Sequence, residues 1–448
     1  MSAAGRMHAG FVSGALLYAL GQGCALLFQW LLLRQFGLQG YGDVGLAHLG
    51  LTTVLFLADL GYASLFLRED PAAPGWEMRW RQALRHRLLA TLALDLAWLV
   101  AAGWSWRGRG EGFGYMLAVL PATLFGLVGY SAPLLAQGRR LQGFAVQQIA
   151  MPVTLALWVP LRHLPEWGGG IGAGLAVSIG YLVQAVVNAV VFAAPLRLLW
   201  PQRGQGRSLL GTAVQLSLLG IVGTLHDRLT PLLLAAVAPA FLPVYLFLGY
   251  LINGASGVFN QFNRLLLAEA TSEAGQRWAQ WLISLVLGGA ALGALALPLA
   301  AEAWGSAMQR AWLPLTTPVL AGGAVALLSG VLAALLIGRH RERALLRLLL
   351  AGLLCSTLLQ LAAAAGSAPQ ALLWGRLVCL LGIAAASLHL CGLRLNGGGG
   401  AALLAALLAA SPWFGRIGWT LAAALLLPAL WIAWRRHGLF APVAERVE

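Results

Sequence analysis

Long apolar stretches recur along the whole chain and are separated by short polar segments. Each stretch has about 18 to 25 residues, which is enough for an α-helix to cross a hydrocarbon core of about 30 Å. The short alternating segments that are typical of a membrane β-barrel are not visible. The pattern therefore predicts an all-α, polytopic membrane protein, and it excludes the soluble globular and disordered classes.

Fourteen stretches are candidate spans, and the thirteenth is the shortest. The total becomes 13 if that stretch does not cross the membrane, or 12 if the last two form one re-entrant unit. The candidate spans are 11–33, 44–67, 88–104, 113–137, 144–161, 171–194, 209–236, 241–265, 281–301, 313–337, 344–364, 372–392, 399–413 and 417–434.

The basic segment Pro195 to Ser208 is the natural boundary between two halves. Tyr41 precedes the second span and Tyr245 opens the eighth, about 204 residues later, and many transporters are built from two related six-helix halves. We therefore expect an N-terminal helical lobe at 1–200, a C-terminal helical lobe at 201–395 and an extra C-terminal helix pair at 396–448. In this prediction the two lobes surround a central cavity.

Every basic side chain in the protein is Arg, and 21 of the 29 fall on one side of the membrane if the N-terminus is cytoplasmic. Six fall on the other side, and two lie within spans. Because cytoplasmic loops carry the excess of basic residues, both termini are expected in the cytoplasm. The same rule accounts for the net charge of +14, so that charge does not indicate a nucleic-acid partner.

The loops are short, and the longest is expected between Arg68 and Arg87. No soluble domain is inserted, and no P-loop, kinase, zinc-protease or Rossmann motif is present. We therefore expect no enzymatic activity and no bound cofactor or metal. Tryptophans near the span ends are interpreted as interfacial anchors: Trp76, Trp80, Trp104, Trp106, Trp158, Trp167, Trp200, Trp278, Trp304, Trp312, Trp413 and Trp434.

The seventh span contains His226, Asp227 and Arg228 in succession. Each polar or ionisable group at that depth costs on the order of 3 kcal/mol, so the groups are expected to face a partner or a water-filled cavity. Arg228 is a candidate phosphate contact, and the alternative is a structural ion pair with Asp227 or Asp59. His226 and Asp227 are candidates for H⁺ or Na⁺ coupling, and the alternative for His226 is a structural role.

Amide side chains occur at helical spacing in two spans. Gln22 and Gln29 are seven residues apart in the first span, and Asn253 and Asn260 have the same spacing in the eighth. Such stripes suit a hydrated cavity that binds sugar hydroxyls. The alternative is hydrogen bonding between helices, which contributes about 0.6 kcal/mol per contact.

Four short motifs resemble one transporter family. The segment Arg34 to Gly42 has the form R-x-x-G-x-x-x-Y-G, and Ala58 to Ser64 contains the element D-L-G. Asp227 and the segment Pro243 to Tyr245 match the start of the second half. The chain thus resembles the Wzx-type polysaccharide flippases of the multidrug/oligosaccharidyl-lipid/polysaccharide (MOP) exporter superfamily, over residues 1 to about 275.

The resemblance implies a flippase that moves an undecaprenyl-pyrophosphate-linked oligosaccharide across the bacterial inner membrane by alternating access. In that fold helices one, two, seven and eight surround the central cavity, so Asp59, late in span two, joins the candidate cavity residues, with a cap or loop partner as the alternative. Arg34, at the outer mouth of span one, is a candidate to receive the phosphate, and the alternatives are an interfacial anchor or a partner in the turn. We expect a monomer in contact with membrane lipid, with a polysaccharide polymerase as a partner. The alternatives are a small-molecule or multidrug exporter of the same fold, and a membrane glycosyltransferase or polysaccharide polymerase.

Overall fold

The described part of the protein forms helices and one small pair of strands. A computed structural model describes residues 3–106, 110–204, 207–269, 273–304, 312–395, 397–410, 418, 420–426 and 440–442. Two three-residue strands, β1 (Leu393–Leu395) and β2 (Phe440–Pro442), pair antiparallel with Arg394 opposite Ala441. Within these residues, seven helices are long and apolar enough to cross a membrane, or eight if one bent pair is a single span. The predicted all-α, multi-pass class is confirmed.

The chain divides into two compact units. Unit 1 comprises residues 1–228 and 249–254, and unit 2 comprises residues 229–248 and 255–448. Each unit is described by itself below. The predicted lobes, 1–200 and 201–395, remain a prediction.

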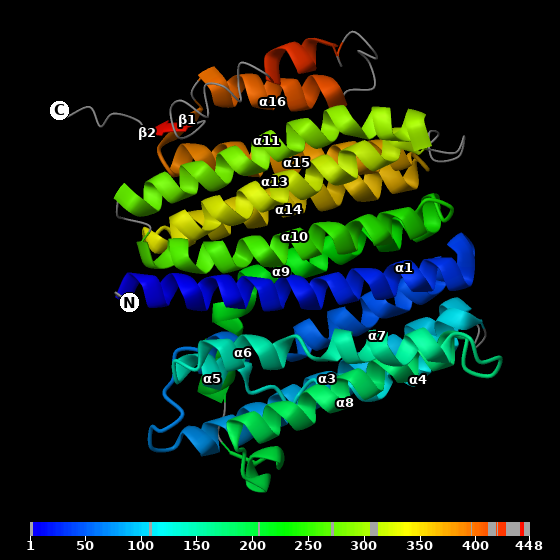
Figure 1. The fold of residues 1–448 in the computed structure, drawn as a ribbon, viewed down its shortest axis with the longest axis vertical. Coiled ribbons are helices and arrows are strands. Elements are labelled where there is room, and N and C mark those ends of the chain that lie inside the picture. Colours follow the sequence, from blue (N-terminus) through cyan, green and yellow to red (C-terminus); the bar gives the residue numbers. More distant parts are fainter. Residues whose placement is uncertain are drawn as a thin grey trace. The chain divides into compact units, whose positions relative to one another are not determined.

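Unit 1 is a bundle in which α4 packs along α8 and α1 packs against α3, α4, α6 and α7 (Figure 1). Its elements are α1 (Ala3–Ala58), α2 (Tyr62–Phe66), α3 (Trp76–Trp106), α4 (Glu111–Phe125), α5 (Ser131–Ala136), α6 (Arg140–Gln147), α7 (Ala150–Leu161), α8 (Gly170–Phe192), the 3₁₀ helix η1 (Leu196–Leu199), the first part of α9 (Arg207–Val237) and a short stretch of α10 (Leu242–Glu269).

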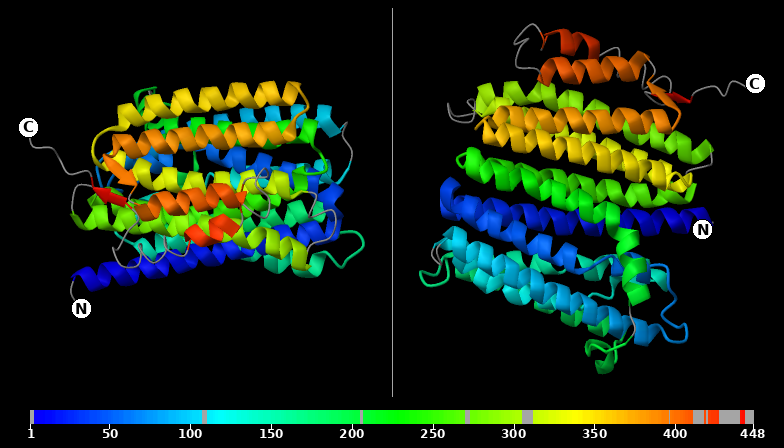
Figure 2. Two further views of the ribbon diagram at one scale, coloured as in Figure 1. Left: turned by 90° about the horizontal axis from the view of Figure 1, so that it is seen from above. Right: turned by 180° about the vertical axis from the view of Figure 1, so that it is seen from behind.

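Helix α1 contains the first predicted span and residues 44–58 of the second, and it folds back on itself near Gly37. This glycine has φ 65° and ψ −175°, a backbone conformation outside the helical region. The hydroxyl of Tyr41 donates to Gln29 Oε1 over 3.1 Å. Twelve residues of straight helix would separate these two positions by about 18 Å, so the bond requires the reversal that is visible in Figures 1 and 2.

The second predicted span, 44–67, is wrong as a continuous helix, because the chain turns at Leu60 and Gly61 before α2 begins at Tyr62.

The predicted fourth span, 113–137, is wrong as a continuous helix. Helix α4 ends at Phe125, and a new helix, α5, begins at Ser131. The intervening segment contains Gly126 and Gly129, and Pro133 stands in the first turn of α5. Hydropathy does not detect this break, because the segment that interrupts the helix is itself apolar.

Aromatic side chains form a stacked core at one end of unit 1. The rings of Trp76 and Trp80 stack at 5.3 Å, Trp80 stacks on Tyr130 at 5.0 Å, and Tyr130 stacks on Phe192 at 4.8 Å. Trp76 and Trp80 are buried in this core, and Trp158 is fully buried elsewhere. The prediction that these three tryptophans are interfacial anchors is therefore wrong.

Other tryptophans in that list do expose their rings. Trp104 is 88% exposed and Trp200 is 68% exposed, and the ring of Trp167 is also accessible. These positions agree with an anchoring role at a membrane interface.

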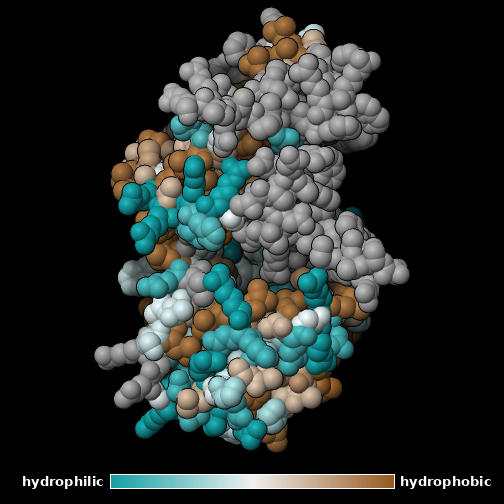
Figure 3. All heavy atoms as spheres, turned by 90° about the vertical axis from the view of Figure 1, so that its left-hand side faces the viewer, coloured by the Kyte–Doolittle hydropathy of each residue, from teal (hydrophilic) through white to brown (hydrophobic). Residues whose placement is uncertain are grey.

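The end of unit 1 that carries α5 and α6 is seen face-on in Figure 3, where hydrophilic side chains gather among hydrophobic ones.

Unit 2 is built on three helices that run side by side, α13 (Leu313–Gly338), α14 (Glu342–Ala365) and α15 (Pro369–Leu390) (Figures 1 and 2). Helix α11 (Glu273–Trp304) packs against α13 and against α16 (Gly397–Ala410). The remaining parts of α9 and α10 also belong to this unit. Most of the predicted fourteenth span lies outside the described residues, so the extra helix pair at 396–448 remains a prediction.

Candidate functional site

A buried cluster of polar and aromatic side chains lies inside unit 1. His48 Nδ1 and the hydroxyl of Tyr115 share a hydrogen bond of 2.5 Å between α1 and α4. The His48 ring also lies 5.7 Å from the ring of Tyr250 on α10 and 6.2 Å from the ring of Phe28. The cluster therefore joins side chains from the first, second, fourth and eighth predicted spans.

Gln29 extends this cluster along α1. Only 1% of its surface is exposed, and its Oε1 accepts the hydrogen bond from Tyr41. Its Nε2 atom has no hydrogen-bond partner among the described residues, and neither does the hydroxyl of Tyr250. Buried donors without a partner are costly, at about 1–3 kcal/mol each, so they are typical of sites that a ligand or water completes.

Arg228 connects the seventh predicted span to the second. The residue is half-buried, and its Nη2 donates to Thr52 Oγ1 over 3.4 Å. Both residues belong to unit 1. Spans two and seven thus meet at a guanidinium and a hydroxyl, both of which bind phosphate or sugar oxygens readily.

The neighbours of Arg228 on α9 differ in burial. His226 is 6% exposed, whereas Asp227 is exposed. Successive residues on a helix point about 100° apart, so Asp227 and Arg228 lie on different faces of α9. A role for His226 or Asp227 in lining a cavity or carrying a coupling ion remains a prediction.

The predicted amide stripes have unequal surroundings. Gln22 is half-buried and lies near Gly254, where a β-carbon on the glycine would be 3.8 Å from the Gln22 Cβ. Spans one and eight are therefore close at this level. Asn253 is exposed, and the side chain of Asn260 lies outside the described residues.

Asp59 has structural partners. Its Oδ2 accepts a hydrogen bond of 3.0 Å from the backbone N–H of Ala63, and its Oδ1 lies 3.5 Å from Arg87 Nε. The next two residues, Leu60 and Gly61, have positive φ values of 52° and 86°. The D-L-G element therefore makes the sharp turn between α1 and α2, and Asp59 caps the start of α2. The sequence suggested Asp227 or Asp59 as an ion-pair partner of Arg228. In the structure Asp59 forms its ion pair with Arg87.

Arg34 lies at the surface, near the kink in α1. Its guanidinium carbon is 4.9 Å from the centre of the Trp30 ring, which is a cation–π contact. The neighbouring Gln35 donates through Nε2 to the carbonyl oxygens of Arg162 and Gly168. The geometry shows an anchored surface residue, and a role for Arg34 in receiving a phosphate remains a prediction.

Sequence reasoning missed His48, Tyr115 and Tyr250. A signal was available, because His48 is an ionisable residue inside an apolar span, which is the same criterion that singled out His226. Tyr115 and Tyr250 are isolated tyrosines in apolar helices, and only the fold brings them to His48. Among the described residues, no group of three His, Cys, Asp or Glu side chains is placed to hold a metal ion.

The two groups of the cluster without a partner among the described residues, Gln29 Nε2 and the Tyr250 hydroxyl, can both donate a hydrogen bond, so we call it the donor-rich cluster. Such a set suits a ligand rich in acceptor oxygens. Neither a family profile nor a curated protein matches the chain. Similarity is found instead among solved structures.

One similar structure is a MOP superfamily transporter from Pyrococcus furiosus, with a TM-score of 0.63 and 13% identity over 85% of this chain and 94% of that one. The chain has the MOP transporter fold. Two further similar structures are the outward-facing and inward-facing conformations of a multidrug resistance MATE family transporter of the same superfamily. The outward-facing structure has a TM-score of 0.61 and 13% identity over 85% of this chain and 94% of its own. The inward-facing structure has a TM-score of 0.60 and 12% identity over 84% of this chain and 93% of its own.

The MOP fold agrees with the superfamily to which the sequence motifs point. All of these similar structures are transporters, and none is an enzyme. The fold and the apolar helices together identify a multi-pass membrane protein. At identities of 12–13% the likeness establishes the fold, and substrate assignment rests on the chemistry of the site.

Proposed function

We propose that this protein is a flippase that moves an undecaprenyl-pyrophosphate-linked oligosaccharide from the cytoplasmic to the outer leaflet of the bacterial inner membrane. The observation that carries the proposal is the half-buried Arg228 beside Thr52 and the donor-rich cluster of unit 1. The MOP fold supports transport by alternating access, because one MATE transporter of that fold is known in inward-facing and outward-facing conformations.

The pyrophosphate is assigned to Arg228. A guanidinium is always charged, and its planar fork of N–H groups binds two phosphate oxygens in a bidentate contact, whereas an ammonium group acts as a point charge. Its contact with Thr52 brings a hydroxyl to the same place. A half-buried position also strengthens the attraction, since less water screens the charge.

The glycan is assigned to the amides and phenols. Gln29 Nε2 and the Tyr250 hydroxyl are two buried groups of the cluster that have no hydrogen-bond partner among the described residues. Gln22 and Asn253 lie on the same two helices. Sugar hydroxyls both donate and accept, so they complement these groups better than an apolar drug would.

The alternative is a multidrug or small-molecule exporter. Two of the similar structures belong to a multidrug resistance transporter, and this favours the alternative. The P. furiosus transporter, however, is described as having a binding pocket of reverse polarity that suggests a different function. Pocket polarity therefore varies among proteins with this fold, and the cationic, donor-rich cluster here favours an anionic glycolipid.

The test is flipping of a fluorescent undecaprenyl-pyrophosphate glycan in proteoliposomes. We expect the unaltered protein to flip the lipid, Arg228→Ala to reduce the rate by about 10-fold or more, and Arg228→Lys to restore part of it. Arg140→Gln is the matched control, because Arg140 of α6 is exposed and its side chain forms no hydrogen bond or ion pair with the described residues, and this variant should retain the full rate. If the unaltered protein does not flip the lipid but exchanges cationic drugs, the exporter alternative replaces this proposal.

The same liposomes test the coupling ion. Proton coupling through His226 or Asp227 predicts that an imposed pH gradient changes the flipping rate, whereas sodium coupling predicts a response to a Na⁺ gradient. The cytoplasmic placement of both termini, the monomeric state and a polysaccharide polymerase partner also belong to this proposal.

A further inference from the structure

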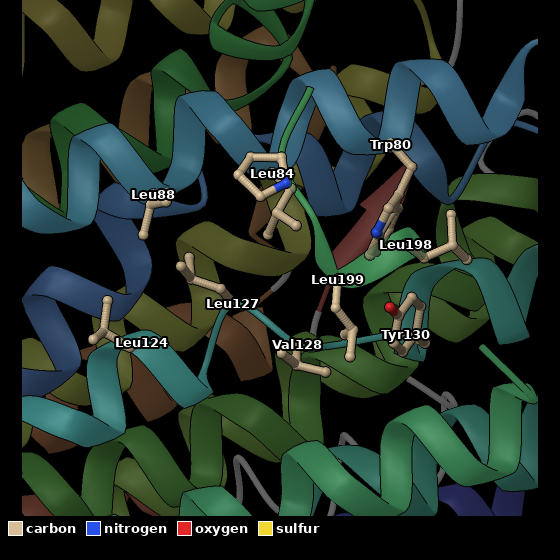
Figure 4. Close-up of a pocket in the computed structure, with 10 residues that line it drawn as sticks. Trp80, Leu84, Leu88, Leu124, Leu127, Val128, Tyr130, Leu198 and Leu199 are labelled. Carbon is tan, nitrogen blue, oxygen red and sulfur yellow. The ribbon is translucent and has the colours of Figure 1, made fainter. Parts of the chain in front are cut away.

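Unit 1 has an apolar pocket away from the donor-rich cluster. Its volume is about 220 Å³, and Figure 4 shows aliphatic and aromatic side chains converging on it from α3, from the end of α4 and its following turn, and from η1. Trp80, Leu84 and Leu88 stand four residues apart, so they form one face of α3. The opposite wall includes Leu127 and Leu199.

The segment that closes the pocket is held to α3 by one side-chain and one main-chain hydrogen bond. Arg81 Nε donates to the carbonyl oxygen of Trp200 over 3.0 Å, and the N–H of Gln202 donates to the carbonyl oxygen of Arg81 over 3.1 Å. Leu198 is buried in the aromatic core, whereas Leu196 is 77% exposed. Helix η1 therefore turns one apolar side inward and another outward, as a segment lying in a membrane interface does.

Two cations border this pocket without an acidic partner. Arg81 and Arg85 are each one residue beyond a pocket-lining residue of α3, and they are four residues apart, so they share one stripe of the helix. Among the described residues neither forms an ion pair. Nearby arginines differ: Arg79, Arg87 and Arg197 pair with Glu69, Asp59 and Glu77.

We propose that this pocket binds an anionic membrane phospholipid, with an acyl chain between α3 and η1 and the head-group phosphate on Arg81 and Arg85. The charge pattern favours an anionic phospholipid as the ligand. An apolar pocket beside two arginines that form no ion pair with the described residues complements a molecule with an acyl chain and a negatively charged head group. A neutral lipid would leave both cations without a counter-charge.

The depth of the pocket agrees with a lipid in one leaflet. Leu88 is the first residue of the predicted span 88–104, and Trp80 and Leu84 precede it in the polar first turns of α3, so the pocket lies at one end of that span, where a lipid head group meets its acyl chains. Side chains of a helix tilt toward its N-terminus, so Arg81 and Arg85 reach back toward the head-group level. The site goes beyond the proposed transport function, since it makes no use of Arg228 or the donor-rich cluster.

The experiment is lipid titration followed by native mass spectrometry of the purified full chain, with phosphatidylglycerol and phosphatidylethanolamine as probes. We expect one tightly retained phosphatidylglycerol. Each Arg→Gln variant at 81 or 85 should weaken it by about 5-fold and the double variant by about 30-fold. Leu199→Trp should also weaken it, because the larger side chain fills the pocket while the charges stay.

Arg140→Gln removes an exposed arginine elsewhere in the unit and should retain the lipid fully. Arg85→Gln breaks no hydrogen bond of the described residues, so it tests the proposal even if Arg81→Gln perturbs folding. Equal retention of both phospholipids, or retention unchanged in Arg85→Gln and Leu199→Trp, would overturn the proposal. Stronger retention of undecaprenyl phosphate than of phosphatidylglycerol would also overturn it, by assigning the pocket to a substrate tail. None of these readouts depends on transport activity.

Discussion

Gly61 provides the most direct test of the packing in unit 1. The residue has φ 86°, and a β-carbon placed on it would overlap the carbonyl oxygen of Ala213 on α9 and lie within 2.6–2.7 Å of the Ser217 side chain. Gly61→Ala therefore imposes two penalties. The left-handed backbone costs about 1–2 kcal/mol for a residue with a side chain, and the overlap with packed backbone costs about 1–3 kcal/mol more.

Gly75 offers a matched control. Its φ is 77°, and nothing lies within 4 Å of the position that a β-carbon would take. Gly75→Ala therefore carries only the backbone penalty. Any gain from a less flexible unfolded chain is common to both substitutions and cancels in the comparison.

The assay is the apparent melting temperature in detergent, followed by intrinsic tryptophan fluorescence. A unit of about this size loses roughly 2–4 °C for each kcal/mol, so Gly61→Ala should melt about 2–12 °C below Gly75→Ala. Equal melting temperatures would refute the close approach of α9 to the turn between α1 and α2. The structural explanation of the D-L-G element would then be wrong as well.

Three further outcomes are expected. Tyr115→Phe should destabilise the protein by about 1–3 kcal/mol, and in a double-mutant cycle most of that loss should disappear when His48 is already Phe, because one hydrogen bond joins them. In unit 2, Gln360→Leu should cost about 0.6–1.7 kcal/mol in a denaturation assay, since Thr230 Oγ1 loses its 2.7 Å acceptor; an unchanged stability would refute that contact. Burial raises the pKa of the Glu69 carboxyl above its ordinary value of 4.5, and the charge of Arg79 opposes this effect only in part. The folded protein therefore holds the Glu69 proton more tightly than the unfolded chain does, so the free energy of unfolding should fall as the pH rises above 4.5. Glu69→Gln should flatten that part of a melting-temperature profile, and an unaltered slope would show that the carboxyl is not responsible.

Hydropathy predicted the helices well where a single apolar helix is uninterrupted. The predicted span 171–194 corresponds to α8, Gly170–Phe192, and 313–337 corresponds to α13, Leu313–Gly338. It failed at Gly126 to Tyr130, where the break is apolar, and at the start of α3, where the polar first turns precede the apolar stretch. Composition averaged over a window contains no information about where a helix ends within apolar sequence.

The site was predictable only in part. Arg228 and Gln29 stood out because a charge or an amide in a span needs a partner or water, and the structure places both in unit 1 with a partner. Tyr115 did not stand out, since an isolated tyrosine in an apolar helix is ordinary. Its role depends on the packing of α4 against α1, which brings its hydroxyl to His48 and which no local pattern of residues specifies.

The stacked rings of Trp76, Trp80, Tyr130 and Phe192 also have an optical consequence. Two indoles held 5.3 Å apart and nearly parallel, at 21°, couple their electronic transitions and should give a circular-dichroism band that isolated tryptophans lack. The stack draws its rings from α3, α8 and the residue just before α5, so the band reports on whether these segments remain packed. The protein therefore carries its own spectroscopic label beside the proposed lipid pocket, of which Trp80 and Tyr130 are also walls.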